Sequence, residues 1–455
     1  MQLEADPLDL EVDAHEARVA QALAQVHAQG GGLLALDKRT SNLFRDRAQG
    51  ERRRLDLSAF SHVIDADPEE GWVDVEGLCT YEDLVAWCLP QGFMPAVVPQ
   101  LRTITAGGAV SGVAIEASSF RHGLVHHTLR ELDVLLPHGE VVTCAPSNAH
   151  ADLFHGFPNS YGSLGYALRL RLATQPVRPY VAVRHRRFAH APAFFEALQA
   201  ACEGDADFVD GVVFAPGDLV LSTARFTDAA PWRSDYGYLD IYWRSLRERE
   251  EDWLSTADWL WRWDTDWFWC SSNFGAQHPL VRRLLGRERL NSRTWQRWMR
   301  AASRHQLAQR LAHWRGRYRE SVIQDVDIPL AHAPAFLDFL HDAIGILPVW
   351  ICPLRGDARG ERFPLYPLQG ARWYVNFGFW DAVERRGDFT PGHFNRLIEA
   401  EVARLGGIKS LYSDSYYPRE AFDRTYGGAA YAHLKAKYDP QHRAPDLYDK
   451  TVGRR

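Results

Sequence analysis

Short apolar runs bounded by turn residues fill the first 175 residues of the chain. These runs predict strands, several of them paired through tight turns, at 33–36, 63–66, 72–75, 132–136 and 141–144. Residues 167–173 alternate apolar and polar side chains with a period of two, which predicts a further half-buried strand. Pro176 and Pro179 end this first region.

Two helices are predicted in the same region from their start and stop signals. Asp13, with a glutamate three residues later, precedes an Ala/Val/Leu-rich segment that stops at the glycine run 30–32. Thr80 and Asp83 have the same capping spacing before a segment that stops at Pro90.

The later chain changes pattern twice. Residues 180–230 and 321–410 alternate strand, helix and strand, which predicts an antiparallel sheet covered by helices. Between them, 11 of the chain's 16 tryptophans fall between Trp232 and Trp314, and the segment 294–319 is basic, aromatic and predicted to be helical.

Composition excludes several classes of protein. A net charge of −6 argues against a protein that binds nucleic acid. The six cysteines are scattered, which favours free thiols in a reducing compartment over a disulfide framework or a zinc site. No secretory signal and no run of about 18 apolar residues is present, so we expect a cytoplasmic chain, peripheral at a membrane if it contacts one.

The candidate chemistry begins with two glycine- and hydroxyl-rich stretches, at 99–128 and 160–165. Thr105, Gly107, Gly108, Ser111 and Gly112 fall within eight positions. Such a stretch exposes backbone N–H groups and lets a planar, phosphate-bearing ligand approach the main chain closely. No Gly-x-Gly-x-x-Gly follows a strand, which argues against a Rossmann site for a second dinucleotide.

The element order resembles that of the flavin-binding domain of the vanillyl-alcohol-oxidase superfamily. The resemblance rests on the polar loop 37–44, the helix entry 76–84 and the stretches 103–112, 118–123 and 160–165. It narrows to the Δ24-sterol reductase branch at four further segments, 115–124, 152–165, 348–354 and 411–422.

The resemblance implies an α+β flavoprotein of three parts. Residues 1–177 would form a two-subdomain, PCMH-type FAD-binding domain, and 178–410 an α+β substrate or cap domain with an antiparallel sheet and a tryptophan-rich helical insertion at 232–320. Residues 411–455 would pack back on the FAD-binding domain. Unlike the sterol reductases of eukaryotes, the chain shows no membrane anchor before the flavin domain, so we expect a bacterial-type relative.

The resemblance also implies which residues contact FAD. On the family's pattern these are Arg39, Thr40, Ser41, Asn42, Thr103, Thr105, Gly107, Gly108, Ser111, Gly112, Ser118, Ser119, His122, Gly123, Gly162 and Gly165. Lys435 is a candidate cation for the N1–C2=O edge of the flavin, with a solvated helix lysine as the alternative.

The first loop contains no histidine, so we expect FAD to be bound non-covalently. No metal is expected, because the adjacent side chains of His126 and His127 diverge.

Similarity to sterol reductases implies reduction of an isolated carbon–carbon double bond in a lipid. Such an alkene accepts a hydride from N5 of reduced FAD only when an acid protonates its other carbon. His122 is our first candidate for this acid, followed by Tyr416 and Tyr412. The alternatives are a structural role for the histidine and core packing for the tyrosines.

The substrate would be a methylene-branched fatty acyl chain or a sterol side chain, with NAD(P)H or a redox partner protein as electron donor. A lipid-modifying enzyme is another expected partner.

Two other functions remain open. An FAD-dependent alcohol oxidase or dehydrogenase uses the commoner chemistry of the superfamily, and a flavin-free lipid-binding protein would use the glycine stretches only for folding. The tryptophan-rich segment has three interpretations: packing within the cap, a face on a bilayer, or a protein–protein surface.

Overall fold

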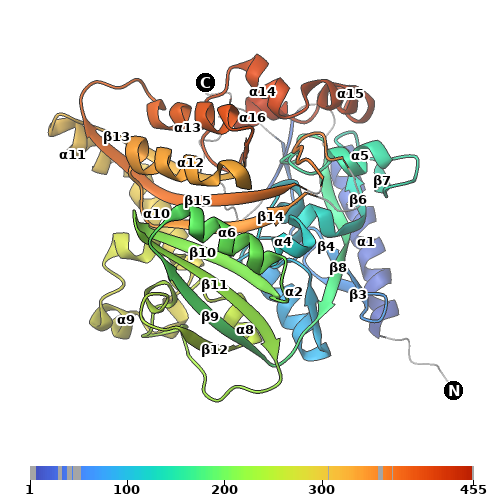
Figure 1. The fold of residues 1–455 in the computed structure, drawn as a ribbon. Coiled ribbons are helices and arrows are strands. Elements are labelled where there is room, and N and C mark those ends of the chain that lie inside the picture. Colours follow the sequence, from blue (N-terminus) through green and yellow to red (C-terminus); the bar gives the residue numbers. More distant parts are fainter. Residues whose placement is uncertain are drawn as a thin grey trace.

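A computed structural model describes residues 7–28, 33–37, 44, 53–305, 307–356, 362–370 and 372–452. The first half of the fold is an antiparallel sheet of six strands, on the right in Figure 1. Its strands run in the order β3 (Val63–Asp67), β4 (Trp72–Glu76), β8 (Tyr166–Pro176), β6 (Leu129–Leu135) and β7 (Val141–Cys144), with β5 (Phe93–Pro95) paired to β8. A separate parallel pair joins β1 (Leu34–Leu36) to β2 (Arg53–Leu55). The helices of this half are α1 (Pro7–Ala28), α2 (Tyr81–Cys88), α3 (Ala106–Ser111), α4 (Ser119–His122) and α5 (Ala151–Gly156).

The second half is an antiparallel sheet of eight strands. Their order is β12 (Glu251–Ser255), β9 (Tyr180–Phe188), β11 (Asp218–Thr227), β10 (Phe208–Ala215), β14 (Val349–Arg355), β15 (Trp373–Arg386), β13 (Arg317–Pro329) and β16 (Ile408–Lys409). Three helices cover one face of this sheet (Figure 1): α6 (Ala191–Cys202), α12 (Ala333–Phe339) and α13 (His393–Arg404). The face is apolar because alternate strand residues such as Val326 and Phe377 point into one core with Phe336 and Ile398.

The remaining helices belong to two other segments. Between β11 and β13 lie α7 (Tyr242–Ser245), α8 (Thr256–Leu260), α9 (Pro279–Leu285), α10 (Ser292–His305) and α11 (Leu307–Trp314). The chain ends with α14 (Arg419–Thr425), α15 (Gly428–Tyr438) and α16 (Leu447–Thr451). Within the described residues, no helix combines the length and the apolar character that crossing a bilayer requires.

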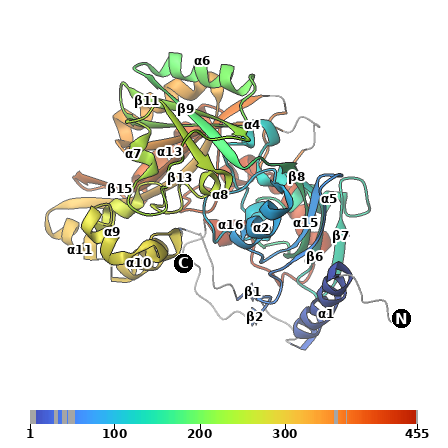
Figure 2. The same ribbon diagram turned by 90° about the horizontal axis from the view of Figure 1, so that it is seen from below.

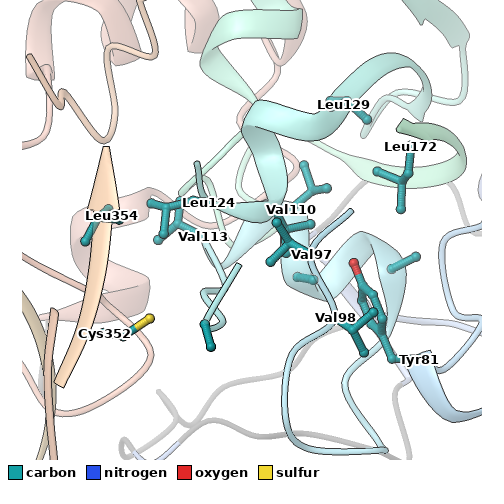
Figure 3. Close-up of a cluster of buried hydrophobic side chains, with 14 of the residues drawn as sticks. Tyr81, Val97, Val98, Val110, Val113, Leu124, Leu129, Leu172, Cys352 and Leu354 are labelled. Atoms are coloured by element: carbon teal, nitrogen blue, oxygen red, sulfur yellow. The ribbon is translucent and has the colours of Figure 1, made fainter. Parts of the chain in front are cut away.

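The two sheets share one hydrophobic core. Figure 3 shows Cys352 and Leu354 of β14 facing Val113 and Leu124 of the first half. The Cys352 thiol also donates to the backbone carbonyl of Glu116, with Sγ and O 3.2 Å apart. The second sheet is therefore packed directly against the end of the glycine-rich stretch.

The C-terminal segment returns to the first half through buried contacts. Lys435 Nζ on α15 donates to the carbonyl of Ser163 at 2.8 Å and pairs with Asp439 at 2.6 Å. The Tyr438 hydroxyl donates to Asp152 at 2.7 Å. These contacts hold the tail against the second glycine-rich stretch.

Most predicted elements are present, and three differ in extent. Helix α1 begins at Pro7, so the Asp13 capping box lies inside it. The glycine-rich stretch, for which no helix was predicted, forms helix α3, because the Thr105 hydroxyl accepts from Gly108 N–H and caps it. The segment predicted as a helix to residue 319 stops at Trp314, because Gly316 adopts a positive φ of 66° and β13 starts immediately afterwards.

Candidate active site

A cavity of about 400 Å³ lies between the two sheets. Its first wall comes from the first half and includes a set of small residues, called the glycine wall below: Gly77, Thr105, Gly107, Gly108, Ser111, Gly112, Gly162 and Gly165. Its second wall comes from the eight-stranded sheet and the insertion, and it is aromatic and acidic.

The glycine wall cannot carry larger side chains. A Cβ on Gly107 would lie 2.9 Å from the carbonyl oxygen of Gly77, and one on Gly112 would lie 2.8 Å from that of Gly108. Gly162, with a φ of 73°, adopts a conformation that favours glycine. The main chain is thereby exposed to the cavity over two separate stretches.

Two carboxyl groups face the cavity from β13. Asp325 and Asp327 are two residues apart on one strand, so both side chains point to the same face, while Val326 between them points into the core beneath α13. Opposite them, β15 presents Asn376 to Asp327 and Gly378 to Asp325.

Asp327 is fully buried and hydrogen-bonded. It accepts from the Tyr366 hydroxyl at 2.7 Å and from Asn376 Nδ2 at 2.7 Å. Burial raises the pKa of Asp327 to about 6, and these two hydrogen bonds limit the rise. This carboxyl is consequently anionic at neutral pH.

Asp325 has a different environment. Burial raises its pKa to about 8, although the Tyr412 hydroxyl is hydrogen-bonded to it. Trp380 Nε1 donates to the Tyr412 oxygen at 2.8 Å, which directs the hydroxyl proton of Tyr412 toward the carboxyl. Asp325 Oδ1 is covered and has no hydrogen-bond partner among the described residues, which adds to the cost of ionisation. Asp325 is therefore mainly a neutral acid at pH 7.

Aromatic rings, including Phe44 of the first half, line the cavity beside these carboxyl groups. Phe268 lies 4.3 Å from Trp380 and 5.5 Å from Trp350, measured between ring centroids, and Trp267 lies 5.3 Å from Phe44. All five rings line the cavity. An apolar ligand would be enclosed here beside a single neutral acid.

The structure brings together only part of the predicted site. Tyr412 lines the cavity on the side of Asp325. Seven further predicted residues line it on the glycine wall: Thr105, Gly107, Gly108, Ser111, Gly112, Gly162 and Gly165. Arg39, Thr40, Ser41 and Asn42 lie outside the described residues. Thr103, Ser118, Ser119 and Gly123 do not line the cavity; Ser118, for example, donates to the carbonyl of Ala96 at 2.9 Å.

The two leading candidates for the acid lie elsewhere. His122 lines a second cavity of about 530 Å³, and burial lowers its pKa, so it is neutral near pH 7. Tyr416 contacts Gly392 at the start of α13, and the Arg396 guanidinium lies over its ring. Neither side chain lines the cavity between the two sheets, and their roles stay predictions.

The lysines also differ from expectation. Lys435 is buried by its bonds to Ser163, Asp439 and Ala444 and does not line the cavity. Lys450 of α16 lines the cavity instead, and its Nζ would lie 3.5 Å from a Cβ on Gly162. Lys450 had no local motif that could mark it, whereas Asp325 and Asp327 carried a usable signal: two acids two residues apart in an apolar strand.

Comparisons with known proteins agree with this geometry. Residues 13–145 match the family model described as an FAD binding domain. The chain is 26% identical over 415 residues to human Δ24-sterol reductase, covering 85% of this chain and 75% of the relative. It is 24% identical over 426 residues to the Δ24-sterol reductase of Arabidopsis thaliana, covering 84% and 74%. Over 192 residues it is 30% identical to cytokinin dehydrogenase 1 of rice, covering 40% and 34%.

The fold and the glycine wall define an FAD-dependent oxidoreductase with a PCMH-type FAD-binding domain and an α+β cap. Within that class, the chain is similar over most of its length to Δ24-sterol reductases.

The residues present fit FAD. The glycine wall leaves space against the main chain, and the covered Gln100 Nε2 and Asn376 Oδ1 that line the cavity have no partner among the described residues. Donors and acceptors of this kind are what a polar ligand with ring nitrogens, carbonyls and phosphates requires.

Proposed function

We propose that the protein reduces an isolated carbon–carbon double bond in a lipid, with Asp325 as the proton donor. The observation that carries the proposal is one neutral carboxyl in an aromatic cavity that also exposes the glycine wall. The names of the relatives, Δ24-sterol reductases, support a substrate of this class.

An isolated alkene imposes two demands on the site. One carbon must receive a proton, and the other must carry cationic character until a hydride arrives. Asp325 meets the first demand because burial keeps it protonated near neutral pH. The rings of Trp267, Phe268 and Trp380 meet the second, since an aromatic face stabilises a cation by about 0.5–2 kcal/mol.

Bound FAD, once reduced, supplies the hydride. Thr105, Gly107, Gly108, Ser111 and Gly112 would hold its polar part, with Lys450 as the cation nearest Gly162. Asp327 is anionic and is held in place by hydrogen bonds from Tyr366 and Asn376. Its negative charge helps to keep Asp325 protonated. FAD would be bound without a covalent attachment to the protein.

We favour a methylene-branched fatty acyl chain as the substrate over a sterol side chain, with NADPH as the electron donor. Both substrates present an isolated, substituted alkene within an apolar chain, and the aromatic wall suits either. An experiment has to decide between them.

The experiment starts from the visible spectrum of the purified protein before and after acid precipitation. Flavin colour that moves to the supernatant supports non-covalent FAD, and colour that stays in the pellet contradicts it. The holoprotein is then incubated anaerobically with NADPH and either a methylene-fatty acyl lipid or a Δ24-sterol. We expect saturated acyl product, whereas no product from either lipid would overturn the proposal.

An alcohol oxidase or dehydrogenase is the second candidate. The anionic Asp327 favours it, since removing a proton from an alcohol requires a base. The same holoprotein mixed with alcohols distinguishes the two: rapid bleaching of the flavin by an alcohol supports the oxidase and contradicts the reductase.

A further inference from the structure

The segment from Pro279 to Gly316 has a charge opposite to that of the whole chain. It carries ten arginines and a single acidic residue, Glu288, within a protein whose net charge is −6. Three of these arginines are paired with carboxylates: Arg282 with Asp266 in the interior, and Arg287 with Asp235 and Arg293 with Glu82 at the surface. Other arginines of the segment are exposed: Arg283, Arg289, Arg297 and Arg315.

Large apolar side chains are exposed on the same helices. Leu280 and Leu284 of α9 are 64% and 83% exposed, and Leu311 and Trp314 of α11 are 45% and 81% exposed. Each pair is spaced by three or four residues, so its members lie on one face of their helix. Trp298 of α10 is 38% exposed.

These helices form one side of the molecule. Figures 1 and 2 both show α9, α10 and α11 on the left, away from α1 and the six-stranded sheet. By contrast, six tryptophans of the insertion are buried, and they fill the interior: Trp259, Trp261, Trp263, Trp267, Trp269 and Trp295. The tryptophan-rich segment is thus divided between a packed interior and an exposed basic, apolar surface.

We propose that α9–α11 form a docking surface for a bilayer of anionic phospholipid. Exposed leucine and tryptophan side chains among arginines suit the boundary between headgroups and acyl chains, where apolar groups enter and guanidinium groups remain with phosphates. The charge is complementary to an anionic leaflet, and the remainder of the chain, being net acidic, would face away from it.

The surface is also connected to the cavity. Trp295 Nε1 of α10 donates to the carbonyl of Thr265 at 2.8 Å, and the hydroxyl of Ser292 donates to Asp264 at 2.5 Å. The segment held in this way continues directly into Trp267 and Phe268 of the cavity wall. If the protein reduces a lipid as proposed, docking would place this cavity wall beside the bilayer that supplies the substrate. This link between docking and substrate supply rests on the proposed function.

Vesicle co-sedimentation of the holoprotein tests the docking surface. We expect binding to vesicles of phosphatidylcholine mixed with phosphatidylglycerol, weaker binding to phosphatidylcholine alone, and weakening by salt. The double variants Leu284→Asp/Trp314→Asp and Arg283→Glu/Arg297→Glu should each lose at least tenfold in affinity. The control Leu397→Asp/Arg187→Glu changes an exposed leucine of α13 and an exposed arginine of β9 and should bind as the wild type does.

Two outcomes would overturn the docking proposal. One is a wild-type protein that ignores anionic vesicles, and the other is an equal loss of binding in the control. A dimer in solution that the first double variant dissociates, without vesicle binding by the wild type, would assign the surface to a second copy instead. Because binding is measured without turnover, its failure is separate from failure of the reductase; a docking variant should still reduce a detergent-dispersed, short-chain methylene substrate at the wild-type kcat.

Discussion

Asp325 differs from Asp327 although the two residues share a strand and a cavity. Asp327 has two hydrogen-bond donors and a pKa of about 6, whereas Asp325 is hydrogen-bonded to one tyrosine and has a pKa of about 8. Burial raises both values, and the charge of Asp327 raises the pKa of Asp325 further. One carboxyl is thereby available as an acid and the other as an anion at the same pH.

Replacing the acid should reduce turnover strongly. We expect Asp325→Asn to lower kcat by about 10²–10⁴-fold, the usual contribution of a general acid, while the flavin content stays unchanged. Steady-state kinetics with a visible spectrum of each preparation measures both quantities. A variant that keeps most of the wild-type kcat would exclude Asp325 as the proton donor.

The pH profile gives an independent test of the same residue. An acid works in its protonated form, so the rate should be constant below about pH 8 and fall by about tenfold per pH unit above it. The residual rate of Asp325→Asn should lack this alkaline decrease. A decrease that persists in the variant would assign the titration to another group.

Gly378 controls where the Asp325 carboxyl lies. A Cβ at this position would lie 2.6 Å from the Trp380 ring and 2.8 Å from Asp325 Oδ1. We therefore expect Gly378→Ala to lower kcat and to destabilise the fold by about 1–3 kcal/mol through overpacking. Gly204→Ala is the matched control, because its nearest neighbour would lie 3.4 Å away. Equal kcat in the two variants would contradict this positioning role.

At the residue scale, sequence alone predicted one wall of the cavity. The small residues from Thr105 to Gly112 stood out because glycines and hydroxyls cluster there in one short stretch. Tyr412 of the acid wall was also predicted, but Asp325 was missed, because only strand pairing and the returning tail bring it close to Trp380 and Tyr412. His122 was chosen because the family resemblance places segment 118–123 beside the flavin ring, and such a resemblance does not show which way a side chain points.

Helix α1 illustrates how one buried carboxylate fixes an element. Glu76 of β4 accepts from Arg18 Nε at 2.7 Å, from His62 N–H at 3.0 Å, and shares a 2.7 Å contact with His15 Nδ1. Burial alone would raise the pKa of Glu76, but these hydrogen bonds outweigh it and lower the pKa. Without the carboxylate, Arg18 and both histidines would lose their common partner.

We expect Glu76→Ala to lower the free energy of unfolding by about 3–5 kcal/mol, the usual cost of removing one member of a buried ion pair. Because the pKa of Glu76 is lowered in the folded state, its contribution is present above the pKa of the unfolded chain and is lost as the pH falls through the folded value. Urea unfolding of both proteins near neutral pH and at acidic pH measures this. A difference between them that does not shrink in acid would contradict the assignment.

At the element scale, prediction succeeded where a single local signal decides the structure. The strand at 167–173 has a period of two, and helix α2 has its Thr80 cap, and both formed as expected. Helix α3 was missed because Gly107 and Gly108 lower helix propensity, and only the Thr105 cap and the close packing on Gly77 stabilise it.

The two halves of the molecule are joined by a buried ion cluster. Arg262 from the insertion lies 2.9 Å from Glu116 of the first half and 2.9 Å from Asp210 of β10, with its guanidinium 3.6 Å from the centre of the Trp259 ring. Burial raises the pKa of Glu116 to about 7. One arginine thus compensates two carboxyls that come from different halves of the chain.

Removing this arginine should weaken the whole fold. We expect Arg262→Met to lower the free energy of unfolding by about 3–5 kcal/mol, because two carboxyls stay buried without their cation. Thermal unfolding followed by flavin fluorescence measures stability and cofactor release together. Arg130→Met, which removes a partly exposed arginine that donates to Gly71, is the control and should have a small effect. Equal stability of the two variants would show that the cluster does not hold the halves together.

On the proposed function, the cavity is where an isolated lipid alkene is reduced. The most direct measurement mixes the anaerobically reduced holoprotein with a methylene-fatty acyl lipid in a single turnover and follows the visible absorbance of the flavin. We predict that the oxidised spectrum returns as one saturated lipid forms per flavin, and that Asp325→Asn slows this return. A flavin that stays reduced with every alkene tested, in a protein whose oxidised flavin is bleached by alcohols, would contradict the account.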